Sequence, residues 1–311
     1  MADVGVYALR SNEPKSTPGG PVGGAGWSVQ TVSMRLLGRP VTALVAVLML
    51  GLTGATITPV SGRAAPQPAE VAADRKQAWA KSFARLEDEL SGPAGVSVVA
   101  VGSRTSLTVG SWLKGVAWST SKVPLSVAAL RRSDSAKTKA RVRRAITKSD
   151  NAAAEKLWRG LGSPKKAGRR VQAVIRDAGD DDTVVQYRRV RPPYTAFGQT
   201  RWALDDQARF SAGLRCRPSS KPVRKLMGRI TASQRWGLGK VDGAKFKGGW
   251  GPVGNGYLVR QMGTIRLDDG RTYGVAIAVH SGDGFGQGTK DLNRVARWLA
   301  KRVDQIPGGR C

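Results

Sequence analysis

A serine and a lysine three residues apart, Ser119 and Lys122, open an apolar helical pattern that constrains this chain more than any other feature. Residues 123–130 have the composition of a buried helix. Side chains three apart lie on one helix face, so we expect the amine beside the hydroxyl. A serine needs a neighbouring base to become a nucleophile, and a lysine amine can serve as that base. The pair predicts a nucleophilic site at the start of a buried helix.

The spacing alone does not single out this serine. Ser111 with Lys114 and Ser163 with Lys166 repeat it, but neither pair leads into an apolar helical face. A structural alternative for Ser119 is a helix N-cap, a position that serine favours.

The histidine content bears on which base could serve. The only histidine in the chain, His280, lies in the alternating apolar residues 273–280, which read as a strand. A Ser-His-Asp site would have to recruit this strand residue, so Lys122 is the better candidate.

The first 65 residues read as a leader outside the fold. A short basic segment begins at Met34, an apolar run covers residues 41–52, and small residues follow. This order is typical of a secretory signal peptide, and the run is short for a membrane span. We expect Met34 to be the start and the protein to be exported, either secreted or held in the cell envelope. The alternative is an uncleaved membrane anchor.

The formal net charge of +29 favours polyanionic partners. For an exported protein we expect anionic cell-wall polymers. We do not expect nucleic acid, because the basic runs lack interleaved aromatic residues. The alternative is that these runs are solvated helix faces. The runs are 131–132, 137–144, 165–170 and 188–191.

Two cysteines, Cys216 and Cys311, are the only ones in the chain. Export permits a disulfide bond between them, and two unpaired thiols are the alternative. One histidine and two distant cysteines do not make a metal site, and no Gly-rich phosphate loop stands out, so we expect no metal and no cofactor.

The order of expected elements predicts an α/β (α+β) fold with an antiparallel sheet flanked by the N- and C-terminal helices and an inserted helical lobe. We assign residues 66–311 to one domain, with a sheet lobe of 66–118 and 236–311 and a helical lobe of 119–235. The expected elements are a helix at 70–90, strands at 96–101 and 107–109, helices through 119–235, a strand pair at 257–267 and 271–280, and a last helix at 292–303.

Three motifs occur in an order that resembles the penicillin-recognising serine hydrolases, specifically the class A β-lactamases. They are Ser119 to Lys122, then Ser149-Asp150-Asn151, then Lys247-Gly248-Gly249, and the resemblance spans residues 68–306. It implies a β-lactamase/transpeptidase-like fold and an acyl-enzyme mechanism.

The resemblance also implies a role for each matching position. Ser119 is the expected nucleophile, Lys122 its base and Ser149 a proton relay; Asn151 and Lys247 are expected to bind substrate, and the strand at Gly249 and Trp250 to complete an oxyanion hole with the backbone N–H of Ser119.

Departures from the family pattern qualify the expected activity. Gly248 stands where the family has a hydroxyl residue, the interval from Ser119 to Ser149 is short, and Arg189 falls where the deacylating glutamate is expected. The resemblance thus implies a monomeric serine hydrolase acting on β-lactams or peptidoglycan-like peptides with poor deacylation. Two alternatives stay open: a D-Ala-D-Ala peptidase or esterase using the same serine, and a non-catalytic cell-wall-binding module.

Overall fold

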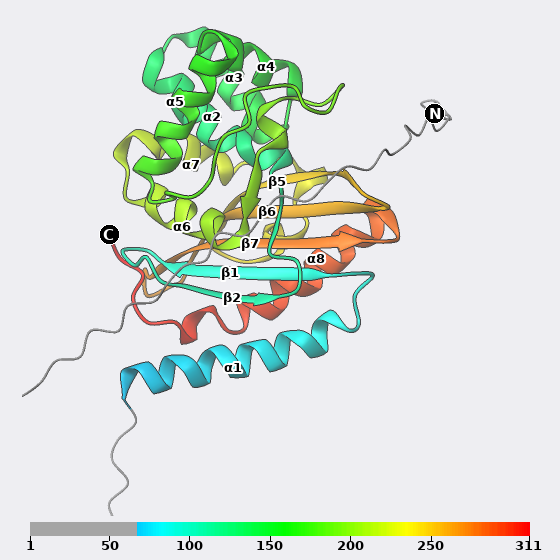
Figure 1. Ribbon diagram of the computed structural model, residues 1–311. Coiled ribbons are helices and arrows are strands. Elements are labelled where there is room, and N and C mark those ends of the chain that lie inside the picture. Colours follow the sequence, from blue (N-terminus) through cyan, green and yellow to red (C-terminus); the bar gives the residue numbers. More distant parts are fainter. Residues whose placement is uncertain (1–66) are drawn as a thin grey trace, which may run out of the picture. The chain divides into compact units, whose positions relative to one another are not determined.

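The computed structural model describes residues 67–311, and the expected leader lies outside this range. A five-stranded antiparallel sheet in the order β2-β1-β7-β6-β5 forms the centre of the fold (Figure 1). Its strands are β1 (Ala94–Ala100), β2 (Ser106–Gly110), β5 (Ala244–Val253), β6 (Gly256–Arg266) and β7 (Thr272–Ser281). The predicted sheet class is therefore confirmed.

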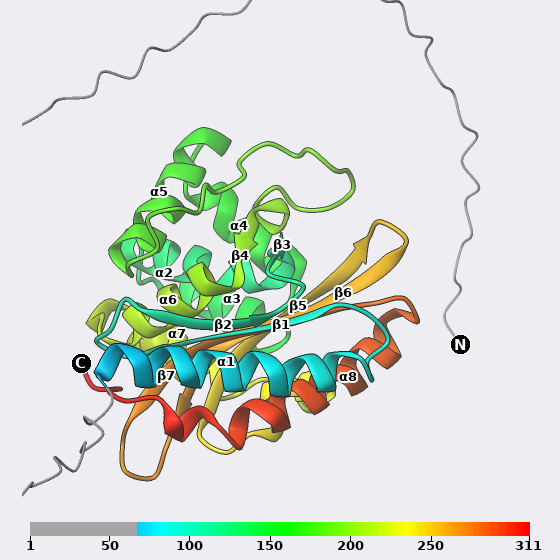
Figure 2. The same ribbon diagram turned by 60° about the horizontal axis from the view of Figure 1, so that its bottom comes forward.

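The first and last long helices cover one face of this sheet, as Figure 2 shows. They are α1 (Pro68–Glu87) and α8 (Gly284–Ala300). Trp79 and Phe83 of α1 meet Trp298 of α8 edge-on, with ring centroids 5.2 and 5.0 Å apart. These aromatic contacts join the two ends of the chain into one layer.

The opposite face of the sheet carries α6 (Leu204–Arg215), which packs on β1, β6 and β7. Gly274 of β7 allows this, because a Cβ there would overlap the backbone of Ala208 and Ala212. Every residue of β1 is buried, as a strand between two helical layers should be.

The other helices gather beyond α6, at one end of the sheet (Figure 1). They are α2 (Lys122–Arg132), α3 (Ala136–Thr147), α4 (Asn151–Gly160), α5 (Pro164–Asp177) and α7 (Lys221–Met227). A short strand pair, β3 (Lys114–Val116) and β4 (Arg201–Ala203), joins this group to the sheet. No helix in the described part of the chain combines the length and apolar character needed to cross a membrane.

Cys216, just after α6, forms a disulfide bond with Cys311 at the end of the chain, across a sequence separation of 95 residues. The bond secures a C-terminal segment whose Gly309 carbonyl accepts a hydrogen bond from the Thr272 amide at 2.7 Å. Closing so long a loop restricts the unfolded chain strongly.

Replacing both cysteines with serine should lower the free energy of unfolding by about 2–4 kcal/mol, because the unfolded chain regains the freedom of that loop. Urea denaturation of the variant beside the oxidised parent measures the difference. An unchanged midpoint would show that the bond contributes nothing to stability.

Candidate active site

Ser119 lies in a single 3₁₀ turn, η1 (Trp118–Ser121), that runs directly into α2. Its neighbours Thr120 and Ser121 donate their hydroxyls to backbone carbonyls of Ala117 and Trp118, at 2.5 and 2.6 Å. The Ser119 hydroxyl instead contacts the Lys122 amine. Neither the turn nor α2 has a side-chain cap from Ser119, so the N-cap alternative does not describe this residue.

Lys122 is buried at the centre of the site, with 1% of its surface exposed. Its Nζ lies 2.8 Å from Ser119 Oγ, 2.7 Å from the Ser149 carbonyl, 2.7 Å from Asn151 Oδ1 and 3.2 Å from Ser149 Oγ. Burial lowers the pKa of Lys122 to about 7, against a smaller opposing effect of the Asp150 charge. A large fraction of this amine is therefore neutral near pH 7.

The contact geometry suits a neutral amine, which has two N–H donors and one lone pair. The two shortest contacts go to oxygens that can only accept, the Ser149 carbonyl and Asn151 Oδ1. The lone pair is then left for the Ser119 hydroxyl proton. Lys122 can thus act as a general base toward Ser119.

Ser149 and Asn151 reach the site through the start of α4. Asp150 caps this helix by accepting from the Ala153 amide at 2.8 Å, and it pairs with Arg144 at 2.6 Å. That amide bond, together with Arg144, lowers the pKa of Asp150. Ser149 has a left-handed backbone with φ of 57°. Such a conformation is uncommon outside glycine and persists when the surroundings hold it, as the capped helix does here.

Lys247 projects from β5 into the same site and is fully buried. Its Nζ lies 3.0 Å from Ser149 Oγ and 2.6 Å from the Gly248 carbonyl. Burial first, and then the charge of Lys122, lower the pKa of Lys247. Two lysines from different elements therefore meet at one serine hydroxyl.

Glycines bring β5 against the nucleophile. A Cβ at Gly249 would lie 2.7 Å from the Ala117 carbonyl oxygen and 2.8 Å from the Ser119 nitrogen. A Cβ at Gly251 would overlap the Trp118 ring, which sits on a left-handed backbone with φ of 50°. Only glycine permits this close approach of the strand to η1.

The arrangement has counterparts among solved structures. The TLA-3 extended-spectrum β-lactamase superposes with a TM-score of 0.63 at 14% identity, over 73% of this chain and 99% of that one. A class A β-lactamase from Bacteroides cellulosilyticus gives 0.60 at 11% identity, over 75% and 99%. PBP-A, solved as an acyl-enzyme with penicillin G, gives 0.57 at 20% identity, over 75% and 97%. The chain has the class A β-lactamase fold. No protein-family model and no curated protein matches the sequence.

Within this β-lactamase fold, Gly248 differs from the expected hydroxyl residue for a visible reason. A Cβ at Gly248 would stand 3.0 Å from the Trp236 ring. Trp236 also lies edge-on to Trp250, with centroids 5.8 Å apart, and Phe285 packs on Trp250 at 5.6 Å. An aromatic wall thus borders Lys247 where the resemblance implies a carboxylate-binding hydroxyl. Trp236 carries no motif, and the sequence did not predict it.

Arg189 lies in the loop between α5 and β4 and pairs with Glu155 of α4 at 3.3 Å. Arg191 of the same loop donates to the Pro252 carbonyl at 2.8 Å and lies over the Trp118 ring. These contacts fix the loop beside η1 and β5. The structure places an arginine, held by a carboxylate, on this loop.

The competing sequence candidates lie elsewhere. Ser111 donates to Glu87, and Ser163 begins α5. His280 Nε2 lies 2.8 Å from the Val253 carbonyl, and its ring stacks on Trp112. No printed contact joins these residues to Ser119 within residues 67–311. Over the same range, no cluster of three His, Cys, Asp or Glu side chains is placed to hold a metal ion.

Proposed function

We propose that this chain is an exported serine acyl-hydrolase that forms an acyl-enzyme at Ser119 with β-lactams or with peptides of the cell wall, and that releases the acyl group slowly. The observation that carries the proposal is the 2.8 Å contact between Lys122 Nζ and Ser119 Oγ, made by a buried amine whose pKa is about 7.

Acylation follows from the positions of the two amines. Lys122 takes the Ser119 proton while Oγ attacks the carbonyl carbon, and the backbone N–H groups of Ser119 and Trp250 stabilise the oxyanion. The Ser149 hydroxyl accepts from both lysines through its two lone pairs, so its own proton is directed to the departing nitrogen. The carbonyl–nitrogen bond then breaks and leaves the acyl group on Ser119.

Deacylation needs a water molecule and a base to take its proton. On the loop where the family resemblance places a glutamate, this chain carries Arg189, and the neighbouring Glu155 is engaged by it. The ester on Ser119 therefore lacks its usual base, and we expect it to persist.

Labelling with a fluorescent penicillin tests the proposed nucleophile. We expect label on the parent protein and none on Ser119→Ala. Ser163→Ala is the matched control, because Ser163 has the same spacing to a lysine, and it should label like the parent. Label that persists on Ser119→Ala would remove Ser119 from the mechanism.

The pH dependence of acylation tests Lys122 as the base. Because the neutral amine is the active form, the rate should rise with pH, reach half its maximum near pH 7 and then level off. Asn151→Asp would place a carboxylate 2.7 Å from Nζ and favour the charged amine, so the midpoint should rise by about 1–3 pH units. Stopped-flow acylation rates across pH measure both midpoints; identical midpoints would contradict the assignment.

A second candidate is a peptidase or esterase for which β-lactams are poor substrates. The aromatic wall at Trp236 favours it, because that ring occupies the place of a carboxylate-binding hydroxyl and offers apolar surface to an acyl group. Turnover of a D-Ala-D-Ala peptide or of a simple ester, without lactam hydrolysis, would select this activity.

A further inference from the structure

A second cavity, about 960 Å³ in volume, is lined by basic side chains and lies between α7 and the ends of the central strands. We call it the basic cleft. None of its residues belongs to the site around Ser119. Its six cations are Arg215, Lys221, Arg224, Lys225, Lys245 and Arg266.

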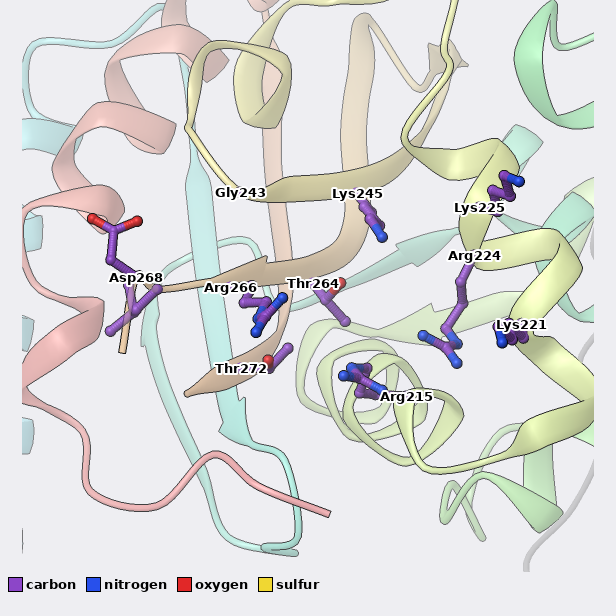
Figure 3. Close-up of a pocket in the computed structure, with 11 residues that line it drawn as sticks. Arg215, Lys221, Arg224, Lys225, Gly243, Lys245, Thr264, Arg266, Asp268 and Thr272 are labelled. Carbon is purple, nitrogen blue, oxygen red and sulfur yellow. The ribbon is translucent and has the colours of Figure 1, made fainter. Parts of the chain in front are cut away.

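Strand register explains why the sheet contributes to this cleft. Lys245 pairs with Thr264, and Arg266 pairs with Thr272, so all four side chains stand on one face of the sheet. That face is the one that α6 and α7 cover, and these helices supply the other cations. Figure 3 shows these side chains around one space, with Arg224 reaching from α7 toward Arg215.

The charge in the basic cleft is not compensated. Within residues 67–311 no carboxylate forms an ion pair with any of the six cations, whereas Arg131, Arg144 and Arg209 elsewhere are all paired. Asp268, the one acidic residue of the lining, stands apart in Figure 3 with its carboxylate turned away. Burial and the charge of Arg215 lower the pKa of Arg224. A bound anion would relieve this repulsion.

The disulfide bond extends the basic cleft and holds it together. A smaller cavity of about 290 Å³ shares Arg215 and Arg266 with it and continues to Arg310. Arg215 precedes Cys216 and Arg310 precedes Cys311, so the bond between these cysteines fixes the two arginines on neighbouring walls. The result is an elongated basic surface, larger than a single small anion requires.

We propose that the basic cleft binds a linear phosphate polymer. Arginine presents a planar fork of donors that matches phosphate oxygens, and four arginines line the two joined cavities. The lining contains no aromatic ring on which a nucleic acid base could stack, which favours a polymer recognised through its phosphates alone. The cleft binds it independently of acylation at Ser119.

Binding of inorganic polyphosphate to the full chain tests this, by fluorescence anisotropy across a salt series. The variant is Arg215→Gln/Lys245→Gln/Arg266→Gln. The matched control is Lys76→Gln/Lys81→Gln/Lys290→Gln, which removes the same charge from exposed positions on α1 and α8, across the sheet. We expect the cleft variant to bind at least about tenfold more weakly and its slope of log K against log salt to be shallower by about two, with little change in the control.

Penicillin labelling of each variant provides a readout of folding and of the other site, and it should match the parent. Equal losses of affinity in the two variants would overturn the proposal, because the net charge alone would then explain binding. Tighter binding of a single-stranded oligonucleotide of equal phosphate number, lost in the same variant, would also overturn it in favour of nucleic acid.

Discussion

Lys122→Met should slow acylation of Ser119 by about 10²–10⁴-fold, the contribution usual for a positioned general base. Methionine keeps the length and apolar stem of the lysine in a buried position, while the group that accepts the Ser119 proton is lost. The residual rate should no longer show a midpoint near pH 7, because the titrating amine has been removed. Stopped-flow acylation by a chromogenic β-lactam measures both changes.

Lys247→Met is the matched comparison, since it removes the other buried amine that contacts Ser149. We expect it to weaken substrate binding while the midpoint near pH 7 persists, because that midpoint belongs to Lys122. A pH midpoint that survives in Lys122→Met and disappears in Lys247→Met would exchange the roles of the two lysines.

Gly249→Ala should reduce acylation by at least about 10²-fold, because displacing reacting groups by about 1 Å has this effect. The added Cβ would meet only backbone, at 2.7 Å from the Ala117 carbonyl oxygen, 2.8 Å from the Ser119 nitrogen and 2.9 Å from the Thr120 nitrogen. No side chain can move aside, so β5 or η1 must shift. The oxyanion hole would lose its geometry even if the fold survives.

Gly160→Ala is the control for this substitution. Gly160 ends α4, and a Cβ there would meet no atom within 4 Å. It should acylate like the parent. A Gly249→Ala protein with parental acylation rates and thermal midpoint would show that the close approach of β5 to η1 is not needed for the chemistry.

Much of the fold could be predicted because the apolar periodicity is regular. The alternation at 96–101 and at 257–280 corresponds to β1, β6 and β7, and the helical spacing near both ends of the domain corresponds to α1 and α8. Strand β5 was predicted only as a short run before Lys247. Its glycines at 248, 249 and 251 lower strand propensity, and they are there because η1 and Trp236 leave no room for side chains.

The candidate site was accessible to sequence reasoning where its residues form short motifs. The structure brings Ser119, Lys122, Ser149, Asn151 and Lys247 together within hydrogen-bond distance. Trp236 could not be predicted, because it meets Gly248 only through tertiary packing. The basic cleft could not either: its cations come from separate segments, and none belongs to the conspicuous basic runs of the sequence.

The measurement that tests the central claim most directly is the intact mass of the protein over time after mixing with excess penicillin, with Ser119→Ala in parallel. Our account predicts one adduct per chain with the mass of the penicillin, absent from Ser119→Ala, that forms faster above pH 7 and persists after the free antibiotic is removed. The absence of an adduct on the parent at every time and pH, with no consumption of the lactam, would contradict the proposed acyl-enzyme.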